Sequence, residues 1–319
     1  MASHFLPGEV STPVIIDNHI LETTMQNFIK ATFNYILETT MQSFIKTTFL
    51  LGLATTVIFA SNTALANKLT DVKARGSVIC GTQNASSPYG FQDPSTREYV
   101  GYDVDICKAI AKEMGLKLEH KPLSTEARIP ELKMGRVDMV AGSMAYLPSR
   151  AIEVDYSLQY LEGNIRVLVK KDSGIKTLAD LAGKKVCASS GSSSAAIASK
   201  VLTKSNVLTF QTVSQCYLGL QNDKVAAMTA GELVLIRFEN DSQKTPTPTE
   251  MLSEPTFTEH IGVVVNKDEP DLLNAINVAL KKIDGSGELT RIYDKWMGKD
   301  SIYKLSRVFK VEPVHESTN

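Results

Sequence analysis

Residues 103–120 have the sequence DVDICKAIAKEMGLKLEH. In its first part, apolar residues recur at the spacing of one helical face: Val104, Cys107, Ala111 and Met114. Gly115 follows as a typical helix stop. Residues 116–120 then alternate between apolar and polar, as a half-buried strand does. The stretch therefore predicts a helix followed directly by a strand.

Strands and helices alternate on both sides of this unit. A buried strand is expected at 78–81, a short helix at 127–134 and a strand at 137–141. Further strands are expected at 165–170, 185–188, 207–213, 225–229 and 261–265, and helices at 178–181, 192–202, 214–221, 232–238, 271–282 and 288–296. The polar, proline-containing segment 240–255 is expected to be a loop. This order predicts mostly parallel sheet covered by helices and favours two α/β lobes; a single doubly wound sheet is the alternative.

The composition is that of an ordinary globular protein. The chain has 319 residues, of which 43% are hydrophobic and 22% charged. This is enough for one large core or two medium ones, and it excludes disordered, collagenous and small disulfide-scaffold proteins. The 34 basic and 35 acidic residues give a net charge of −1. Nucleic-acid binders usually carry a basic excess, so no nucleic-acid partner is expected.

A secretory signal peptide is expected near the N-terminus. Lys46 is followed by an apolar run at 47–60 and by a small-x-small end at Ala64-Leu65-Ala66. The run is shorter than the roughly 20 residues that a membrane span needs. Cleavage after Ala66 and a periplasmic location are therefore expected, with an uncleaved N-terminal anchor as the alternative.

The segment before this signal is a local duplication. Residues 21–33 recur almost unchanged at 37–49, a repeat too short for a solenoid. Met41 is the expected natural start. Residues 1–66 are therefore interpreted as a leader, with the signal peptide at about 41–66 and an extra N-terminus before it, and the fold is sought in the rest.

Several motifs in that remainder stand in a recognisable order. They are VGYDVD at 100–105, RIPEL at 128–132, GRVD at 135–138, GS at 142–143, PSR at 148–150, LADLAGKKV at 178–186, SGSSS at 190–194 and YDKW at 293–296. By their joint order and spacing the chain resembles the periplasmic solute-binding proteins of polar amino-acid ABC importers, known as family 3. It is most similar to the glutamate/aspartate and general L-amino-acid branch.

This resemblance implies an α/β, two-lobed periplasmic-binding-protein fold of type II. Each lobe would be a mostly parallel sheet flanked by helices, and two crossover strands would join the lobes near Tyr160-Leu161 and Ile261-Gly262. Lobe 1 would comprise 67–160 plus 263–300 and lobe 2 would comprise 161–262, with a C-terminal tail at 301–319. The lobes would close over a ligand held between them.

The resemblance also implies a transport function. The protein would capture a polar, acidic L-amino acid in the cleft between the lobes and deliver it to a membrane ABC permease. It would act as a monomer, without a cofactor and without catalysing a reaction.

A ligand carboxylate needs a cationic partner when it is buried, and the planar fork of arginine is the best one. Arg150 follows the strand at 137–141, at the edge where open α/β sheets bind ligands. The resemblance assigns Arg150 to the α-carboxylate of the ligand. A surface arginine that caps a helix is the alternative.

A serine-rich turn at 190–194 joins the strand at 185–188 to a helix. Free N–H groups at such a helix start attract anions. The resemblance places Ser193, beside Ser192, on the same carboxylate as Arg150 but from the other lobe. Plain N-capping by serine is the alternative, and both interpretations can hold together.

The rest of the expected site also comes from the resemblance. Ser143 would contact the ligand backbone, and Arg128 and Thr125 would reach a side-chain carboxylate. Gln83 stands where the acidic-amino-acid branch often has a basic residue, and Tyr89 lies near the aromatic that packs over the ligand. A solvated Arg128 and a core Tyr89 are the alternatives.

Two positions depart from the family pattern. Gly231 stands where the family usually has an aspartate that binds the α-ammonium group, and Ala145 replaces a threonine that helps to hold the ligand backbone. Glu232, next to the glycine, is a candidate substitute for the aspartate. If nothing replaces it, the ligand would be a dicarboxylate or oxo acid that lacks the amine.

The four cysteines are expected to form disulfides, because exported proteins meet an oxidising compartment. Four cysteines allow three pairings. We predict the pairs Cys187–Cys216 and Cys80–Cys107, because the other two pairings would cross the lobes and resist hinge motion. Buried free thiols are the alternative.

The sequence shows no catalytic or metal-binding set. The five histidines lack the spacing of metal ligands, and neither a G-x-S-x-G motif nor a P-loop occurs. A cyclohexadienyl-dehydratase-like enzyme on the same fold is an alternative function. It would need a carboxylate in the cleft, for which Glu126 and Glu232 are the candidates.

Overall fold

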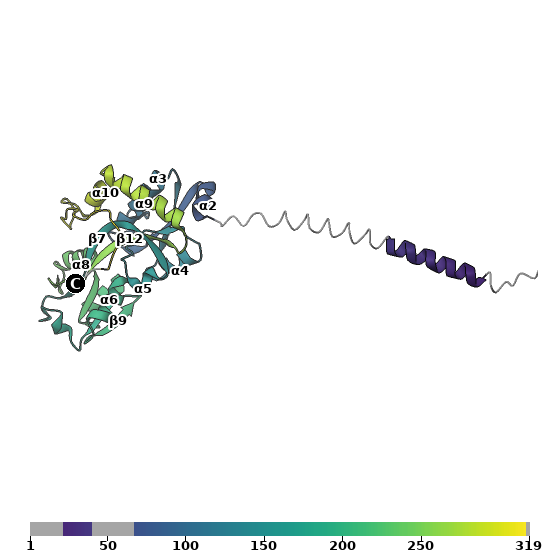
Figure 1. Cartoon of the computed structure of the whole chain (residues 1–319). Helices are drawn as coiled ribbons and strands as arrows, with labels where there is room; N and C mark the ends of the chain where they lie inside the picture. Colours follow the sequence, from purple (N-terminus) through teal and green to yellow (C-terminus); the bar gives the residue numbers. More distant parts are fainter. Residues whose placement is uncertain (1–21, 40–66, 317–319) are drawn as a thin grey trace, which may run out of the picture. The chain divides into compact units, whose positions relative to one another are not determined.

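The computed structural model describes residues 22–39 and 67–316 (Figure 1). The chain divides into two units, residues 1–65 and 66–319. Within the first unit, residues 22–39 form a helix whose side chains are all exposed. The expected signal peptide at 41–66 lies outside the described residues. In the part of the chain that the structure describes, no helix has the length and apolar character of a membrane span.

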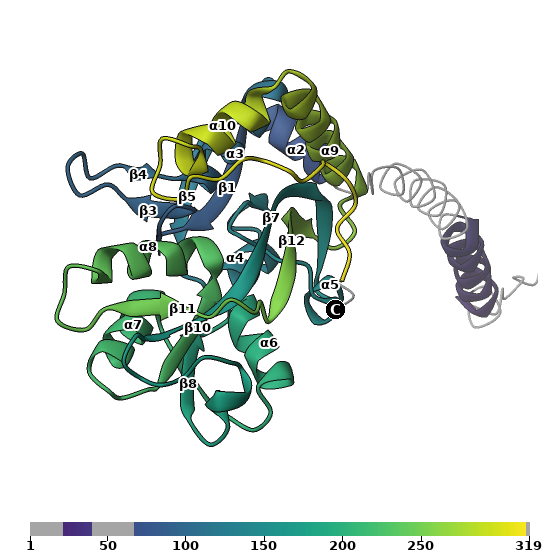
Figure 2. The same ribbon diagram turned by 90° about the vertical axis from the view of Figure 1, so that its left-hand side faces the viewer.

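A nine-stranded mixed sheet runs through the second unit. Its order is β5-β1-β6-β12-β7-β10-β8-β9, and β11 pairs with β7 beside this path. Its strands are β1 (Ser77–Gln83), β5 (Lys117–Leu123), β6 (Met139–Val140), β7 (Val154–Lys170), β8 (Lys185–Ser189), β9 (Asn206–Phe210), β10 (Ala227–Gly231), β11 (Thr249–Met251) and β12 (Phe257–Asn266). Figure 2 shows β7 and β12 side by side in the middle of the unit.

The sheet consists of two parallel parts joined by an antiparallel pair. β1 is parallel to β5 and β6, and β8 is parallel to β9 and β10. β12 is antiparallel to both β6 and β7, and β7 is antiparallel to β10. We call β5, β1 and β6 with their helices the first half, and β10, β8 and β9 with theirs the second half. The expected pair of α/β lobes with two crossover strands is thereby confirmed.

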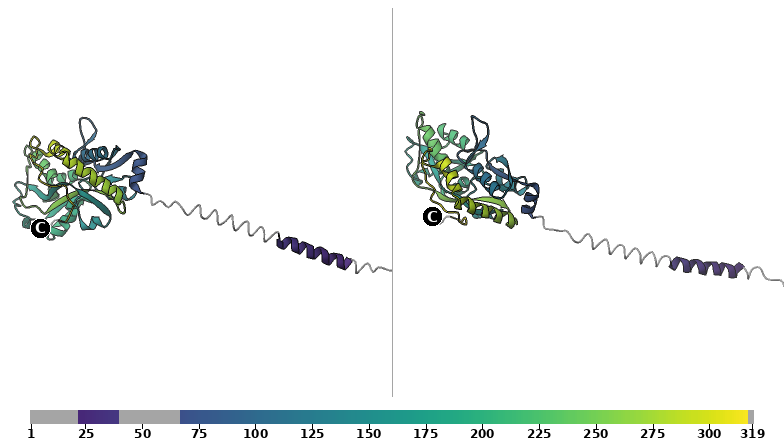
Figure 3. Two further views of the ribbon diagram at one scale, coloured as in Figure 1. Left: turned by 45° about the horizontal axis from the view of Figure 1, so that its top comes forward. Right: turned by 90° about the horizontal axis from the view of Figure 1, so that it is seen from above.

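Helices cover both faces of the first half because neighbouring strand residues point to opposite sides. Met139 packs with the cluster that includes α3 and α9, whereas Val140 packs with Leu132 of α4. The helices are α2 (Lys68–Arg75), α3 (Tyr102–Glu113), α4 (Arg128–Lys133), α9 (Pro270–Gly285) and α10 (Glu288–Met297). In Figure 3, α9 and α10 are the yellow-green helices that pack against α3.

In the second half, too, neighbouring strand residues point to opposite sides of the sheet and pack against helices on both faces. Val186 and Ala227 pack with Ala198 of α6, whereas Cys187 and Met228 face the cluster that contains α7 and α8. The helices are α6 (Ser193–Val201), α7 (Val213–Gln221) and α8 (Glu232–Ser242), and a 3₁₀ turn, η1 (Ala179–Leu181), precedes β8. Each half is therefore a sheet between two helical layers.

A small antiparallel sheet and a close backbone contact anchor the start of α3. The sheet comprises β2 (Ala85–Ser86), β3 (Gly90–Gln92) and β4 (Tyr99–Val100). Gly101, just before α3, has φ +144°, and a Cβ there would lie 2.2 Å from the carbonyl oxygen of Tyr89. Only glycine permits this approach. The backbone N–H of Asp103 donates to that same carbonyl at 2.9 Å, which fixes the loop carrying Tyr89.

Several expected boundaries are wrong. The strand expected at 207–213 ends at Phe210, and α7 begins at Val213. The strand expected at 165–170 is the end of β7, which begins at Val154 and continues through the crossover. The segment 240–255 is not one loop, because α8 runs to Ser242 and Thr249–Met251 form β11. β11 forms because β7 extends beyond its pairing with β12 and leaves an unpaired edge, which Thr249–Met251 complete.

Both expected disulfides are present, Cys80–Cys107 and Cys187–Cys216. The first links β1 to α3 and the second links β8 to α7. Each bridge therefore lies within one half, and neither ties the halves to each other.

The C-terminal segment after α10 lies along the crossover strand β7. The backbone N–H of Gln159 donates to the carbonyl of Glu312 at 2.8 Å, and its side-chain amide donates to the carbonyl of Lys310 at 2.7 Å. Leu158 and Pro313 form an isolated antiparallel bridge. The segment 310–313 is therefore attached to β7 at this crossover by one isolated bridge and two hydrogen bonds.

We expect the two disulfides to contribute comparably to stability. They close loops of similar length, with sequence separations of 27 and 29 residues. Replacing either pair by alanine should lower the free energy of unfolding by about 3–4 kcal/mol, because the unfolded chain without the bridge has a higher conformational entropy. Guanidinium denaturation of C80A/C107A and C187A/C216A measures this. A loss below about 1 kcal/mol for either pair would contradict the prediction.

Candidate functional site

A cavity of about 40 Å³ lies between the two halves, at the carboxyl ends of the parallel strands. The first half contributes Gln83, Ser86, Tyr89, Thr125, Arg128 and Ser143 to its wall. The second half contributes Ser189, Ser192, Ser193, Ser194, Val213, Thr229, Ala230, Gly231 and Val234, and β12 contributes Glu259. This volume has room for only a few water molecules. A larger ligand therefore requires the two halves to move apart.

Seven of the nine expected ligand-binding residues line this cavity. They are Gln83, Tyr89, Thr125, Arg128, Ser143, Ser192 and Ser193. Arg150 and Glu232 are not among the lining residues. The described structure thus brings most of the expected site together from segments far apart in the sequence.

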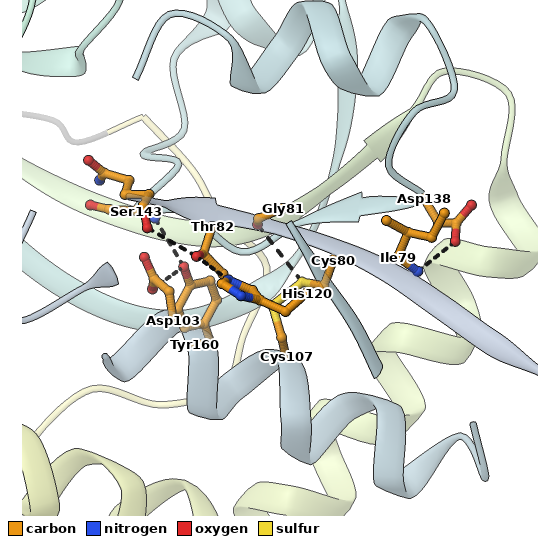
Figure 4. Close-up of a disulfide and its surroundings, with 11 residues drawn as sticks. Ile79, Cys80, Gly81, Thr82, Asp103, Cys107, His120, Asp138, Ser143 and Tyr160 are labelled. Atoms are coloured by element: carbon orange, nitrogen blue, oxygen red, sulfur yellow. Dashed lines mark hydrogen bonds between the residues drawn. A yellow bond between two sulfur atoms is a disulfide. The ribbon is translucent and has the colours of Figure 1, made fainter. Parts of the chain in front are cut away.

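Ser143 is held in a strained backbone conformation by a buried network (Figure 4). Its φ is +51°, and its N–H donates to the hydroxyl of Tyr160 at 3.3 Å. That hydroxyl donates in turn to Oδ1 of Asp103 at 2.8 Å. Burial raises the pKa of Asp103 to about 8, although the Tyr160 hydrogen bond and the charge of Arg128 oppose the rise. The network therefore positions Ser143 at the cavity wall.

Arg128 is buried, so the alternative of a solvated arginine is wrong. Its Nε donates to the carbonyl of Thr125 at 2.9 Å, and its Nη1 donates to the carbonyl of Gly142. Burial, followed by the charge of Arg150, lowers its pKa to about 10, so the guanidinium remains charged at neutral pH. Gln83 also donates to the Gly142 carbonyl, at 3.3 Å. Arg128, Thr125 and Gln83 thus form one polar end of the cavity.

Arg150 joins the two halves directly. It lies in α5 (Pro148–Ala151) and is 8% exposed, so it is not a surface arginine. Nη1 donates to the carbonyl of Ala145 at 3.1 Å, and Nη2 donates to the carbonyl of Gly191 in the second half at 3.0 Å. The guanidinium therefore lies behind the serine-rich turn rather than on the cavity wall.

In the serine-rich turn, the neighbouring residues Ser192 and Ser193 make different hydrogen bonds. Ser192 is the N-cap of α6: its hydroxyl accepts from the N–H of Ala195 at 3.1 Å and donates to the carbonyl of Ser189 at 2.6 Å. Ser193 instead directs its hydroxyl to Oε1 of Glu259. The capping interpretation therefore describes Ser192, and Ser193 is the residue with a contact inside the cavity.

Glu259 is a site residue that the sequence analysis missed. It lies in β12, is 3% exposed, and lines the cavity. Burial raises the pKa of its carboxyl group, and the Ser193 hydrogen bond and the charges of Arg150 and Arg128 act against that rise. The available signal was a charged residue inside a strand otherwise buried along most of its length.

Gly231 leaves space beside this carboxylate. A Cβ at Gly231 would lie 3.2 Å from the hydroxyl of Tyr89 and 3.5 Å from Oε2 of Glu259. Tyr89 is buried, and its pKa is raised by burial and by the charge of Glu259. Glycine, tyrosine and glutamate therefore meet at one corner of the cavity.

Glu232 does not take the place of the missing aspartate. Its carboxylate accepts from Nε of Arg166 at 3.2 Å and from the side-chain amide of Asn164 at 3.1 and 3.2 Å. Both partners are on β7, outside the cavity wall. Glu126, the other carboxylate considered for catalysis, is also absent from the lining residues.

The described residues hold no group of His, Cys, Asp or Glu side chains arranged for a metal ion. What the cavity wall offers is polar: serine and threonine hydroxyls, the buried guanidinium of Arg128 and the buried carboxylate of Glu259. Such a set can pair with both charges of a small zwitterion.

Comparison with known proteins identifies the family to which the chain belongs. The family model described as bacterial extracellular solute-binding proteins, family 3, matches residues 78–299. The ABC transporter glutamine-binding protein of Bacillus subtilis is 29% identical over 245 residues, covering 76% of this chain and 88% of that protein. The L-glutamate/L-aspartate-binding protein of Pseudomonas aeruginosa is 26% identical over 243 residues, covering 73% and 80%.

Solved structures show the same fold. An ancestral arginine-binding protein bound to arginine superposes with a TM-score of 0.65 at 34% identity, covering 70% of this chain and 99% of that one. The names of these relatives include glutamine, glutamate and arginine as ligands. The α/β periplasmic-binding-protein fold is thereby confirmed, whereas the branch of the family stays a prediction.

Asp103 should make stability fall as the pH rises. Its folded-state pKa is about 8, whereas an unfolded aspartate titrates near about 4. The folded protein therefore holds a proton that the unfolded chain releases, and the free energy of unfolding decreases between these pH values. D103N keeps the oxygen that accepts from Tyr160 and should remove a slope of up to about 1.4 kcal/mol per pH unit. Urea denaturation of both proteins across this range tests it, and identical slopes would contradict it.

Proposed function

Because the chain belongs to family 3 of the bacterial extracellular solute-binding proteins and is the substrate-binding component of an amino-acid ABC importer, we propose that it captures an acidic L-amino acid. The cavity between the halves is the proposed binding site, and a membrane permease is the proposed recipient. The observation that carries the proposal is a pair of buried guanidinium groups: Arg128 lies on the cavity wall, and Arg150 lies behind the serine-rich turn, bonded to the carbonyl of Gly191.

Arg150 and Ser193 are the proposed partners of the α-carboxylate. Arg150 belongs to the first half and already bonds the carbonyl of Gly191, two residues before Ser193 in the second half. A carboxylate held by both residues would link the halves and favour the closed form. Ser143, beside the buried Asp103–Tyr160 network, is the proposed contact for the ligand backbone.

The charge of the site favours an acidic side chain. Two arginines are buried at or beside the cavity, and Glu259 is the acidic residue on its described wall. Asp103, with a pKa of about 8, is mostly protonated at neutral pH. A net positive site attracts a ligand of net negative charge. Arg128, with Thr125 and Gln83 beside it, is the proposed partner of the ligand's side-chain carboxylate.

The comparisons do not favour the dehydratase-like alternative, although Glu259 supplies a carboxylate on the cavity wall. The relatives named above are binding proteins, and neither of the carboxylates considered for catalysis lines the cavity. The protein is therefore treated as a binding protein and not as an enzyme.

We also propose that the functional form is a periplasmic monomer whose lobes are 67–160 plus 263–300 and 161–262. The division at residue 65 between the two units supports a leader that is separate from the binding part. Asn67 caps α2 by accepting from the N–H of Leu69 at 3.0 Å, so the fold begins next to the proposed cleavage point.

Cleavage after Ala66 should be visible on the exported protein. Mass spectrometry of the N-terminal peptide should find Asn67 as the first residue, because the small-x-small pattern ends at Ala66. A mature N-terminus elsewhere in the leader would contradict the proposed site.

A thermal-shift panel of the proteinogenic amino acids and simple dicarboxylates tests the function, since a ligand that binds only the folded state raises the melting temperature. L-glutamate or L-aspartate should give the largest shift. R150A should weaken their binding by about 30-fold or more, since the anionic head loses its buried partner.

The matched control is R291A, which removes an exposed arginine paired with Glu288 on α10. It should leave the shift unchanged. An undiminished shift in R150A would contradict the role of Arg150. A larger shift with glutamine or arginine would leave transport in place and contradict the acidic ligand.

A further inference from the structure

We infer that Glu259, on the crossover strand β12, binds the α-ammonium group of the ligand in place of the aspartate that position 231 lacks. The inference rests on the proposed function and deepens it. It requires the ligand to be an α-amino acid with a free amine, and it excludes an oxo acid or simple dicarboxylate as the preferred ligand.

The first observation is the position of the carboxylate. Oε2 of Glu259 is 3.5 Å from where a Cβ of residue 231 would stand. Gly231 is at the end of β10 in the second half, whereas Glu259 comes from β12, which pairs with β7 at Ile165 to Phe257 and onward. A carboxylate therefore reaches the corner beside Gly231 from a different strand.

The second observation concerns the other carboxylates near the cavity, none of which is as well placed as Glu259 to bind an ammonium group. Among the described residues that line the cavity, it is the one carboxylate. Glu232 is engaged by Arg166 and Asn164 and is absent from the lining residues. Asp103 lies behind the hydroxyl of Tyr160 and is absent from the lining residues. An ammonium group in this cavity would therefore find its negative partner in Glu259.

The third observation is the cost of burying this carboxylate. It is 3% exposed, and within the part of the chain that the structure describes it accepts a side-chain hydrogen bond from the hydroxyl of Ser193. A carboxylate has about four acceptor sites on its two oxygens, and an ion removed from water costs several kcal/mol unless it is well paired. An ammonium donates three N–H groups and one positive charge, which satisfies this need.

The arrangement also makes Ser193 a link between the two ends of the ligand. Its hydroxyl contacts Glu259, and it lies at the start of α6, two residues after the Gly191 whose carbonyl Arg150 binds. The proposed partners of the carboxylate and of the ammonium are thus neighbours around one turn. A compact zwitterionic head, with its two charged groups on one carbon, matches this spacing.

The test first removes the carboxylate of Glu259 and then places a carboxylate at position 231 instead. The probes are L-glutamate and 2-oxoglutarate, which differ in the amine, with L-glutamine and L-arginine as further amino acids, and affinities are measured by calorimetry. E259Q keeps the size of the side chain and an oxygen for Ser193 but removes the charge. E259Q and E259A should weaken amino-acid binding by about 30-fold or more, while 2-oxoglutarate should bind at least as well as to the unmodified protein.

The double variant E259A/G231D should recover amino-acid affinity to within about tenfold of the unmodified protein, since it removes the Glu259 carboxylate and supplies another one beside it, with a small shift of the Tyr89 hydroxyl that lies 3.2 Å from the new Cβ. G231D alone should bind amino acids more weakly, because two carboxylates then compete for the same corner. E162Q is the control, since Glu162 is a partly exposed acid on β7 that faces His260. It should bind as the unmodified protein does.

Circular dichroism and thermal unfolding of each variant identify any that fail to fold, and the double variant then decides. Unchanged amino-acid affinity in folded E259Q, or a double variant no better than E259A, would overturn the inference. If R150A abolishes amino-acid binding while E259Q does not, the transport function stands and this inference alone fails. If the unmodified protein binds no amino acid, both fail.

Discussion

The two halves of the binding unit are joined through the antiparallel pairing of β7 with β12, and the site depends on this pair. The pairing shifts register between Ile261 and Gly262, where their partners are Leu161 and Gln159, so Tyr160 is an extra residue on β7. Such a bulge redirects a side chain and increases the local twist. Here it directs the Tyr160 hydroxyl to Asp103 and Ser143. The strand pair therefore connects the halves and also shapes the cavity wall from which a ligand would be held.

The second constraint is the burial of ionisable side chains near the cavity, which differ in the partners that compensate their burial. Arg128 and Arg150 obtain partners from backbone carbonyls, which offset part of the cost of burying a guanidinium. Burial raises the pKa of both Asp103 and Glu259, and Glu259 also accepts a hydrogen bond from the Ser193 hydroxyl. The cavity wall therefore carries groups of both signs, Arg128 and Glu259, which suit the two charges of a zwitterion. The fold thus fixes the positions of the buried arginines and of Glu259. A ligand must be correctly oriented to pair with both kinds of charge at once.

Much of this architecture could be predicted from the sequence, because local spacing carries it. The helical face through Val104 and Cys107, the stop at Gly115 and the alternation after it correspond to α3 and β5. β11 could not be predicted, because it depends on an edge that β7 exposes far away in the sequence. Glu259 was missed for a similar reason: its importance comes from Gly231 and Ser193, which approach it only in the folded chain. Arg150 was expected on the cavity wall, but its orientation follows from the Gly191 carbonyl across the halves.

The segment 310–313 beside Gln159 bears on how the protein can be trimmed or labelled. The family match ends at residue 299, so a recombinant fragment cut there would appear complete by sequence alone. It would nevertheless lose the two carbonyls that accept from Gln159, at the crossover that links the halves. A fluorophore or affinity tag attached after residue 316 would begin close to the crossover strand β12, since the ring of His315 lies 3.9 Å from that of His260 on β12. The C-terminus is therefore the natural attachment point for a reporter of domain movement and a poor one for an inert handle.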